Sequence, residues 1–386
     1  MRRISAFTFA ALVSAAPTAG WTQSENDIPI GVVQPLTGDV AVSGQYVLDG
    51  ARIAAAKINA DGGVLGRKIT LIAGDGKSTP RDSATAAERL ILRDHVPVLM
   101  GAWGSSFTLS VMPLLEENSL PMLVETSSSP KITTSGNPWI FRISPTFKME
   151  AEGFLTKLGE FNPPIKKAAF LAVNNDFGLA GTAAFKTALE SKGVAIGPME
   201  TMASDSTDFS AQLENIKASG ADTMFVTTAV EQLTLIEKQA AGLRLSVRTV
   251  GVGGSTEPDQ LIQQAGKAAN GTYLTLFFLP WFPDKTPHPQ LAEQFVSEWK
   301  KAGYDFGGLT EGFRGYDGIT TIAAAIREAG STEPDKIRQA FWKVKVEGLN
   351  GNIAFAPEGP KGKESGQSTP NVYIVQIQDG KVVLLQ

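Results

Sequence analysis

The stretch that decides the fold is residues 167–202, which read KAAFLAVNNDFGLAGTAAFKTALESKGVAIGPMETM. The compact apolar run at 167–173 predicts a buried strand, because it is short and bounded by polar residues. Residues 178–192 predict a helix, and residues 198–202 predict a second strand. A strand, a helix and a further strand in succession are typical of a crossover unit, in which the helix connects two parallel strands.

The same alternation continues on both sides of this stretch. The residues around it predict a helix at 147–160, a helix at 208–219, a strand at 222–227, a helix at 231–242 and a strand at 247–251. An earlier series predicts strands at 28–33, 68–73, 96–100 and 121–124, and helices at 46–59, 79–93 and 105–117. Repeated units of this kind imply parallel sheets covered by helices on both faces. Because Ile143-Ser144-Pro145 separates the two series, we predict an α/β protein with two doubly wound lobes.

The remaining third of the chain predicts further elements of the same kinds. An apolar run covers 272–279, helices are expected at 288–302, 311–329 and 333–345, and strands at 372–377 and 382–385. The turn Asp379-Gly380 joins the last two strands, as in a hairpin.

Composition excludes several classes of function. The chain has 386 residues, 35 basic against 39 acidic side chains, no cysteine and two histidines. A chain without a basic excess lacks the charge that binds nucleic acid phosphates, so we expect no nucleic acid partner. Without cysteine there is no disulfide, thiolate nucleophile or cysteine-ligated metal. With only His95 and His288, a multi-histidine metal site is excluded too, and we expect no metal and no cofactor.

The first 22 residues have the pattern of a secretory signal peptide. Arg2 and Arg3 precede an apolar stretch at 4–16, small residues follow, and the sequence becomes polar from Gln23 onward. The alternative is a membrane anchor, but thirteen apolar residues are too few to cross a bilayer, which needs about 20. We therefore expect cleavage between Ala16 and Gln23 and a mature protein in the periplasm.

Catalytic motifs are not found. Gly76-Lys77-Ser78 resembles the end of a phosphate-binding loop, but Leu71 occupies the position of the required earlier glycine. The turn after the first strand lacks the glycines of a dinucleotide-binding fingerprint. No serine has glycine two residues away on both sides, so there is no nucleophile elbow. We therefore expect a protein that is not an enzyme.

Two hydroxyl-rich loops follow predicted strands and precede helices. They are Gly101-Ala102-Trp103-Gly104-Ser105-Ser106 and Glu125-Thr126-Ser127-Ser128-Ser129-Pro130. In open α/β sheets ligands bind beyond the carboxyl ends of the strands. Backbone N–H groups at a helix start, together with serine hydroxyls, can hold a carboxylate without a full positive charge. The alternative is that these serines only cap helices.

With these loops the sequence resembles the periplasmic solute-binding proteins of the branched-chain-amino-acid family, which feed ABC importers. The resemblance covers nearly the whole mature chain. It rests on residues 30–38 (IGVVQPLTG), Gly50-Ala51, residues 58–66 (INADGGVLG), the two hydroxyl loops, Phe141-Arg142, residues 175–178 (NDFG) and residues 208–210 (DFS). It implies two α/β lobes joined by three crossings, near residues 143–147, 275–279 and 348–353. Lobe one would comprise 28–144 plus 278–350, and lobe two 145–277 plus 351–386.

The resemblance also implies where a ligand binds. Ser105, Thr126 and Ser128 match lobe-one groups that hold the ligand's carboxylate and ammonium, and Phe177 matches a lobe-two aromatic residue that closes over it. A tyrosine expected after strand 222–227 is replaced by Thr227, Thr228 or Ala229. The candidate ligand-binding residues are Trp103, Ser105, Ser106, Thr126, Ser127, Ser128, Phe177, Thr228 and Gly253.

One departure from the family concerns the charge of the ligand. The acid that pairs with the ammonium of an amino acid should lie at Gly253 or Gly254, where there is no carboxylate. Either Glu125 or Glu257 substitutes, or the ligand has no ammonium, because a desolvated ammonium without a carboxylate is costly. We hypothesise that a hydrophobic or aromatic monocarboxylate binds at least as well as leucine, isoleucine or valine, with Trp103, Tyr46 and Phe177 available for ring contact.

The expected partners follow from the resemblance as well. They are a small-molecule ligand and the permease and ATPase subunits of an ABC importer, with the binding protein itself a monomer. The alternative is a ligand-sensing subunit that is not coupled to transport, since the same fold serves in amide- or acid-responsive receptors.

Overall fold

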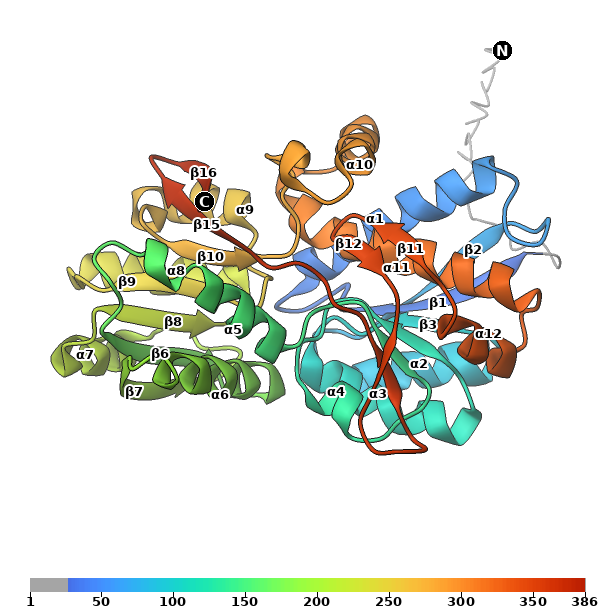
Figure 1. Ribbon diagram of the computed structural model, residues 1–386, viewed down its shortest axis with the longest axis horizontal. Helices are drawn as coiled ribbons and strands as arrows, with labels where there is room; N and C mark the ends of the chain where they lie inside the picture. Colours follow the sequence, from blue (N-terminus) through green and yellow to red (C-terminus); the bar gives the residue numbers. More distant parts are fainter. Residues whose placement is uncertain (1–26, 386) are drawn as a thin grey trace, which may run out of the picture.

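The computed structural model describes residues 27–385, which form two lobes side by side (Figure 1). The predicted signal peptide lies outside the described residues. Within 27–385, no helix combines the length and the apolar character needed to span a membrane.

Lobe one is built on a seven-stranded sheet in the order β13-β14-β5-β4-β3-β1-β2, whose central strands run parallel. Its strands are β1 (Ile28–Gln34), β2 (Ile69–Asp75), β3 (Leu99–Gly101), β4 (Met122–Val124), β5 (Ile140–Arg142), β13 (Ala356–Glu358) and β14 (Ser365–Gln367). One face is covered by α1 (Ala41–Ala60), α10 (Pro289–Lys301), α11 (Leu309–Ala329) and α12 (Pro334–Phe341). The other face is covered by α2 (Pro80–Leu92), α3 (Ser105–Asn118) and α4 (Lys131–Thr134). A hairpin of β11 (Val346–Gly348) and β12 (Gly351–Ile353) packs beside α11.

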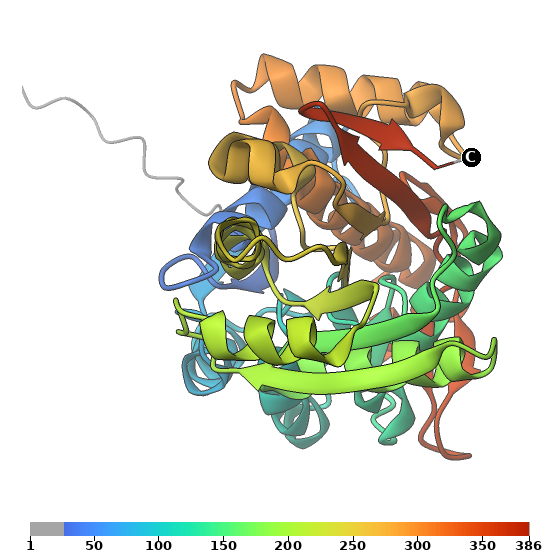
Figure 2. The same cartoon turned by 90° about the vertical axis from the view of Figure 1, so that its left-hand side faces the viewer.

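Lobe two repeats this plan with the order β16-β15-β10-β9-β8-β6-β7. Its strands are β6 (Lys167–Val173), β7 (Ala195–Met202), β8 (Thr223–Thr227), β9 (Arg248–Val252), β10 (Tyr273–Leu276), β15 (Tyr373–Gln378) and β16 (Lys381–Leu384). Figure 2 views the molecule from this lobe, which has helices on both faces of its sheet. They are α5 (Phe147–Thr156) and α6 (Asp176–Glu190) on one face, and α7 (Ser210–Ser219), α8 (Val230–Gly242) and α9 (Pro258–Ala265) on the other.

The third crossing between the lobes differs from the sequence prediction. The chain crosses first between β5 and α5 and again after β10, but the hairpin β11–β12 and the strands β13 and β14 all remain with lobe one. Gly366 and Gln367 of β14 pair in parallel with β5, and Arg142 Nε donates to Gln367 Oε1 over 2.6 Å. The last crossing therefore lies between Gln367 and Tyr373, the red segment that reaches β15 in Figure 1, and not at 348–353.

Helices α1 and α11 approach each other so closely that their backbones touch. A Cβ atom on Gly50 would lie 1.7 Å from the carbonyl oxygen of Gly312, and one on Gly315 would lie 1.9 Å from that of Val47. Such contacts admit only glycine, because no real Cβ atom approaches another heavy atom to within 3 Å. We call the contact of these three glycines the glycine seam.

Candidate ligand-binding site

A cavity of about 240 Å³ lies between the two lobes at the carboxyl ends of their strands. Lobe one contributes residues after β1, β2 and β3, and lobe two contributes residues after β6, β7 and β8. Five of the nine candidate residues line it, namely Trp103, Ser105, Ser106, Phe177 and Thr228. The structure thus brings residues that are far apart in the sequence to one enclosed space, as the strand-end rule predicts.

The other hydroxyl loop is placed differently. Thr126, Ser127 and Ser128 are buried and do not line the cavity. The Ser127 hydroxyl donates to the carbonyl oxygen of Ala102 over 2.9 Å, so it ties this loop to the cavity loop. The candidate Gly253 also lies outside the lining, although a Cβ atom there would meet the ring of Phe177 at 2.3 Å.

The start of α3 is the polar part of the lobe-one wall. Ser105 and Ser106 open the helix, Gly104 is its N-cap, and its first turn contains no acidic residue. The Ser105 hydroxyl accepts a hydrogen bond from the backbone N–H of Ser129 over 3.2 Å, which holds the two loops together. The N-terminal N–H groups of a helix attract anions, so this start can receive the carboxylate of a ligand.

Aromatic side chains supply the apolar part of the cavity. Trp103 is 9% exposed, and its indole N–H donates to Glu311 Oε2 over 3.0 Å. Phe177 lies on the lobe-two side and packs against Phe147 with ring centroids 5.1 Å apart. Two aromatic faces on opposite lobes suit a small apolar ligand body.

Sequence reasoning missed the acidic residues of the cavity. Asp39 from lobe one and Glu231 from lobe two line it, and no lysine, arginine or histidine does so among the described residues. Glu231 lies in the first turn of α8, where an acidic residue is ordinary because it complements the helix dipole. Burial raises the pKa of Glu231 to about 7.

Polar contacts across the cleft hold the lobes together. Ser43 of lobe one donates to Glu257 Oε1 over 2.6 Å, and Arg314 donates to the carbonyl oxygen of Gly254 over 3.1 Å. Near the cavity, Asp176 accepts from Ser106 over 3.1 Å and from Lys131 Nζ over 2.8 Å. These contacts join residues of both lobes, so the structure shows the closed arrangement.

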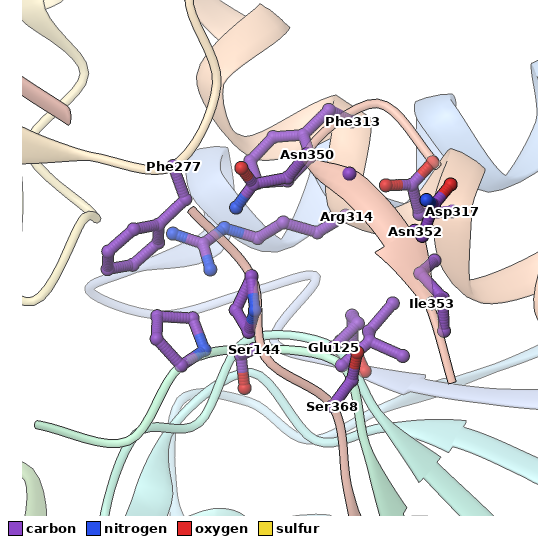
Figure 3. Close-up of a pocket in the computed structure, with 14 residues that line it drawn as sticks. Glu125, Ser144, Phe277, Phe313, Arg314, Asp317, Asn350, Asn352, Ile353 and Ser368 are labelled. Atoms are coloured by element: carbon purple, nitrogen blue, oxygen red, sulfur yellow. The ribbon is translucent and has the colours of Figure 1, made fainter. Parts of the chain in front are cut away.

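A second, small cavity lies among the crossings between the lobes (Figure 3). Its volume of about 20 Å³ is enough for one water molecule. Glu125 lines it and accepts a hydrogen bond from Gln34 Nε2 over 2.7 Å, so this acid lies away from the ligand cavity. Figure 3 shows the guanidinium of Arg314 directed toward Phe277, and its Cζ is 5.2 Å from the centroid of that ring.

Comparisons with known proteins agree with this architecture. The model of the family described as periplasmic binding protein matches residues 27–381. A Leu/Ile/Val-binding protein homolog of Brucella melitensis is 26% identical over 388 residues, which cover all of both chains. A leucine-, isoleucine-, valine-, threonine- and alanine-binding protein of Pseudomonas aeruginosa is 25% identical over 90% of this chain and 91% of its own.

A solved structure shares the fold as well. It is a solute-binding protein of an ABC transporter from Rhodopseudomonas palustris in complex with 3,4-dihydroxybenzoic acid. Its TM-score is 0.79 and its identity 26%, and the match covers 93% of this chain and 95% of that one. Two sheets of the expected topology, a cavity between them and a family match over nearly all of the described residues lead to one conclusion: the chain belongs to the periplasmic binding protein family.

Proposed function

We propose that the protein is the solute-binding subunit of an ABC importer, which captures a small hydrophobic carboxylic acid between its lobes and delivers it to a membrane permease. The observation that carries this proposal is the cavity of about 240 Å³ between the lobes. This volume is just below the range for drug-sized ligands, roughly 300–1,000 Å³, and so suits a smaller ligand such as an amino acid or a benzoic acid.

The shape and chemistry of the cavity support this ligand class. The start of α3 offers N–H groups and the Ser105 hydroxyl to a carboxylate, and Trp103 and Phe177 offer apolar faces to the remainder. The relatives support it too, because their names include both branched-chain amino acids and a hydroxylated benzoic acid. Membership in a family of binding proteins agrees with the expectation that the chain is not an enzyme.

The proposed role in import implies a location in the cell and protein partners. We expect residues 1–22 to be removed on export and the mature monomer to act in the periplasm. The permease and its ATPase subunits would then be the protein partners. Membrane vesicles that contain the permease and ATPase test this step, since uptake of labelled ligand should require the binding protein.

A thermal-shift screen of purified protein tests the binding function itself. The panel is leucine, isoleucine, valine, alanine, benzoate, 4-hydroxybenzoate and 3,4-dihydroxybenzoate. A ligand at a hundred times its Kd should stabilise the folded state by about 2.7 kcal/mol, because it binds only that state. Calorimetry should then give one site per chain. If neither amino acids nor aromatic acids shift the melting temperature, the proposed ligand class is wrong.

A further inference from the structure

A chain of buried hydrogen bonds leads from the wall of the ligand cavity to two of the crossings between the lobes. Arg142 lies at its centre, at the end of β5 and directly before the first crossing. The side chain of Arg142 is fully buried. Because burying a guanidinium is costly unless its N–H groups find acceptors, the acceptors of Arg142 show which parts of the lobe it holds in place.

The guanidinium contacts the hydroxyl loop that follows β4. Its Nη1 donates to the carbonyl oxygens of Ser129 over 2.6 Å and Ser127 over 3.2 Å, and its Nη2 donates to the Thr133 hydroxyl over 2.7 Å. The backbone N–H of Ser129 in turn donates to the hydroxyl of Ser105, which lines the cavity. Two hydrogen bonds, both made by the backbone of Ser129, therefore connect Arg142 to the cavity wall.

The same guanidinium contacts the start of the last crossing. Arg142 Nε donates to Gln367 Oε1, and the side chain of Gln367 is 4% exposed. Gln367 Nε2 donates to the carbonyl oxygen of Ser144 in the first crossing over 2.9 Å, and to that of Ser368 in the last crossing over 2.7 Å. Gln367 thus joins two crossings to each other and to Arg142. We call the following four residues the hinge relay: Ser105, Ser129, Arg142 and Gln367.

The direction of its donors, and not a direct ion pair, fixes Arg142 in this network. Its printed partners are neutral, and the carboxylate of Glu358 in β13 accepts from the Thr133 hydroxyl and not from the guanidinium. Burial lowers the pKa of Arg142 to about 10, and the charge of Glu358 opposes this shift. A planar guanidinium holds its donors in a rigid fork, which lets one side chain reach the loop on one side and Gln367 on the other.

We propose that the hinge relay couples occupancy of the cavity to closure of the lobes, with Arg142 and Gln367 as positioning residues; the inference rests on the proposed solute-binding function. Closure changes the backbone angles of the crossings, and Gln367 bonds to the backbone of two of them. A displacement of the crossings therefore shifts Gln367 and Arg142, and through Ser129 the Ser105 hydroxyl. A ligand that fits the cavity only in its closed shape stabilises the closed form through these bonds.

A network that only stabilised lobe one would behave differently when broken. Its loss would lower the melting temperature and leave the relation between binding and closure unchanged. A network that sets the closure equilibrium also changes the apparent affinity, because the measured Kd depends on the fraction of protein in the binding-competent form. Affinity and compaction are therefore the readouts that separate positioning from stability.

Gln367→Met tests the relay, since methionine fills a similar volume without the amide that makes all three hydrogen bonds. With the best ligand of the thermal-shift panel, calorimetry should give a Kd about tenfold above that of the parent protein. Small-angle scattering should show a smaller decrease in the radius of gyration on addition of ligand. In a Ser105→Ala background the same substitution should raise the Kd less than about threefold, because the relay no longer reaches the cavity.

Two further variants assign the effect. In Gln367→Glu the new carboxylate still accepts from Arg142 but cannot donate to the carbonyl oxygens of the crossings, so its Kd should rise as in Gln367→Met. Asn59→Leu is the matched control, because the amide of Asn59 bonds to the backbone of Ile69 at the end of the sheet opposite the cavity. Asn59→Leu should lower the melting temperature and leave the Kd and the compaction unchanged.

The outcomes separate this inference from the proposed function. If a folded Gln367 variant keeps the Kd and the compaction of the parent, or if Asn59→Leu alters them equally, the relay is wrong and the solute-binding role stands. If neither Gln367 variant folds, hydrogen exchange of the parent protein decides. Ligand should slow exchange of the Ser129 and Ser368 amides, which donate to Ser105 and to the Arg142 carbonyl, and unchanged exchange overturns the relay. If no panel compound binds the parent, the proposed ligand class is wrong and the coupling falls with it.

Discussion

Two of the helix starts that border the ligand cavity, those of α3 and α8, differ in one respect. The first turn of α3 in lobe one contains no acidic residue, whereas the first turn of α8 in lobe two contains Glu231. Both starts present N–H groups that favour negative charge. At α8 the helix supplies that charge itself, whereas at α3 an acid of the other lobe, Asp176, accepts a hydrogen bond from Ser106. We propose that the free N–H groups at the start of α3 receive the carboxylate of the ligand.

The largest predicted effect is on protein stability, and it should differ between the aromatic cavity residues of the two lobes. Trp103→Ala should lower the free energy of unfolding by about 3–5 kcal/mol, because it removes a packed indole and the donor to the buried Glu311. Phe177 is less buried, so Phe177→Ala should cost only about 1–2 kcal/mol of stability. Urea unfolding curves measure both values. Equal losses would mean that the two lobes contribute alike to the walls of the cavity.

A second test concerns the carboxylate position in lobe one. Ser105→Ala should weaken ligand binding by about 1–3 kcal/mol, the cost of leaving a charged acceptor short of one hydrogen bond. The family resemblance also implied a ligand contact for Ser128, but Ser128 is buried outside the cavity lining and serves here as the matched control. Calorimetry with the best ligand of the screen decides between them. A Ser128→Ala loss as large as that of Ser105→Ala would place the carboxylate at the other loop.

The smallest effect concerns the ion pair between the lobes. Hydrogen bonding from Lys131 lowers the pKa of Asp176 in the closed form. Because the pKa of Asp176 is lowered in the closed form, ionised Asp176 stabilises that form at pH values above the ordinary aspartate pKa of about 4. This stabilisation is lost as the pH falls through the lowered pKa. Both side chains are partly exposed, so Lys131→Met should cost closure less than about 1 kcal/mol.

Small-angle scattering with ligand present checks this prediction. The radius of gyration of Lys131→Met should exceed that of the parent protein slightly at pH 7 and low salt. The difference should vanish at 1 M salt, where exposed charges are screened, and at a pH below the lowered pKa. A difference that persists under both conditions would show that the lysine acts through packing instead.

The sequence predicted the sheet and helix series well because the signal is local. The strand at 167–173 is β6 with identical bounds, and the helix expected at 231–242 is α8, which begins one residue earlier. The third crossing was misplaced because β13 and β14 have three residues each and contain Pro357 and Gly366, which indicate turns in an isolated sequence. The pairing of β14 with β5 depends on contacts between residues more than two hundred positions apart, and β13 joins the sheet through β14.

Only part of the site was predictable, because its lining depends on contacts between residues that are distant in the sequence. Both hydroxyl loops follow a strand and carry serines, and only the three-dimensional structure shows that one faces the cavity. Ser127 of the other loop donates inward to the carbonyl oxygen of Ala102. The search for an acid began at Gly253 and Gly254, the positions suggested by the family, and considered Glu125 and Glu257 as substitutes. Glu231 was missed because an acidic residue in a first helical turn has a common explanation without any ligand.

The glycine seam has a consequence for how sequence change would affect recognition. Gly50 lies in the interior of α1, far along the helix from Ser43, yet an alanine there would force α1 and α11 apart. Because α1 carries Ser43 and α11 carries Glu311 and Arg314, that displacement would misalign the partners of the acids behind the cavity. A Gly50→Ala substitution, which adds one buried methyl group outside the ligand cavity, would thus change ligand selectivity.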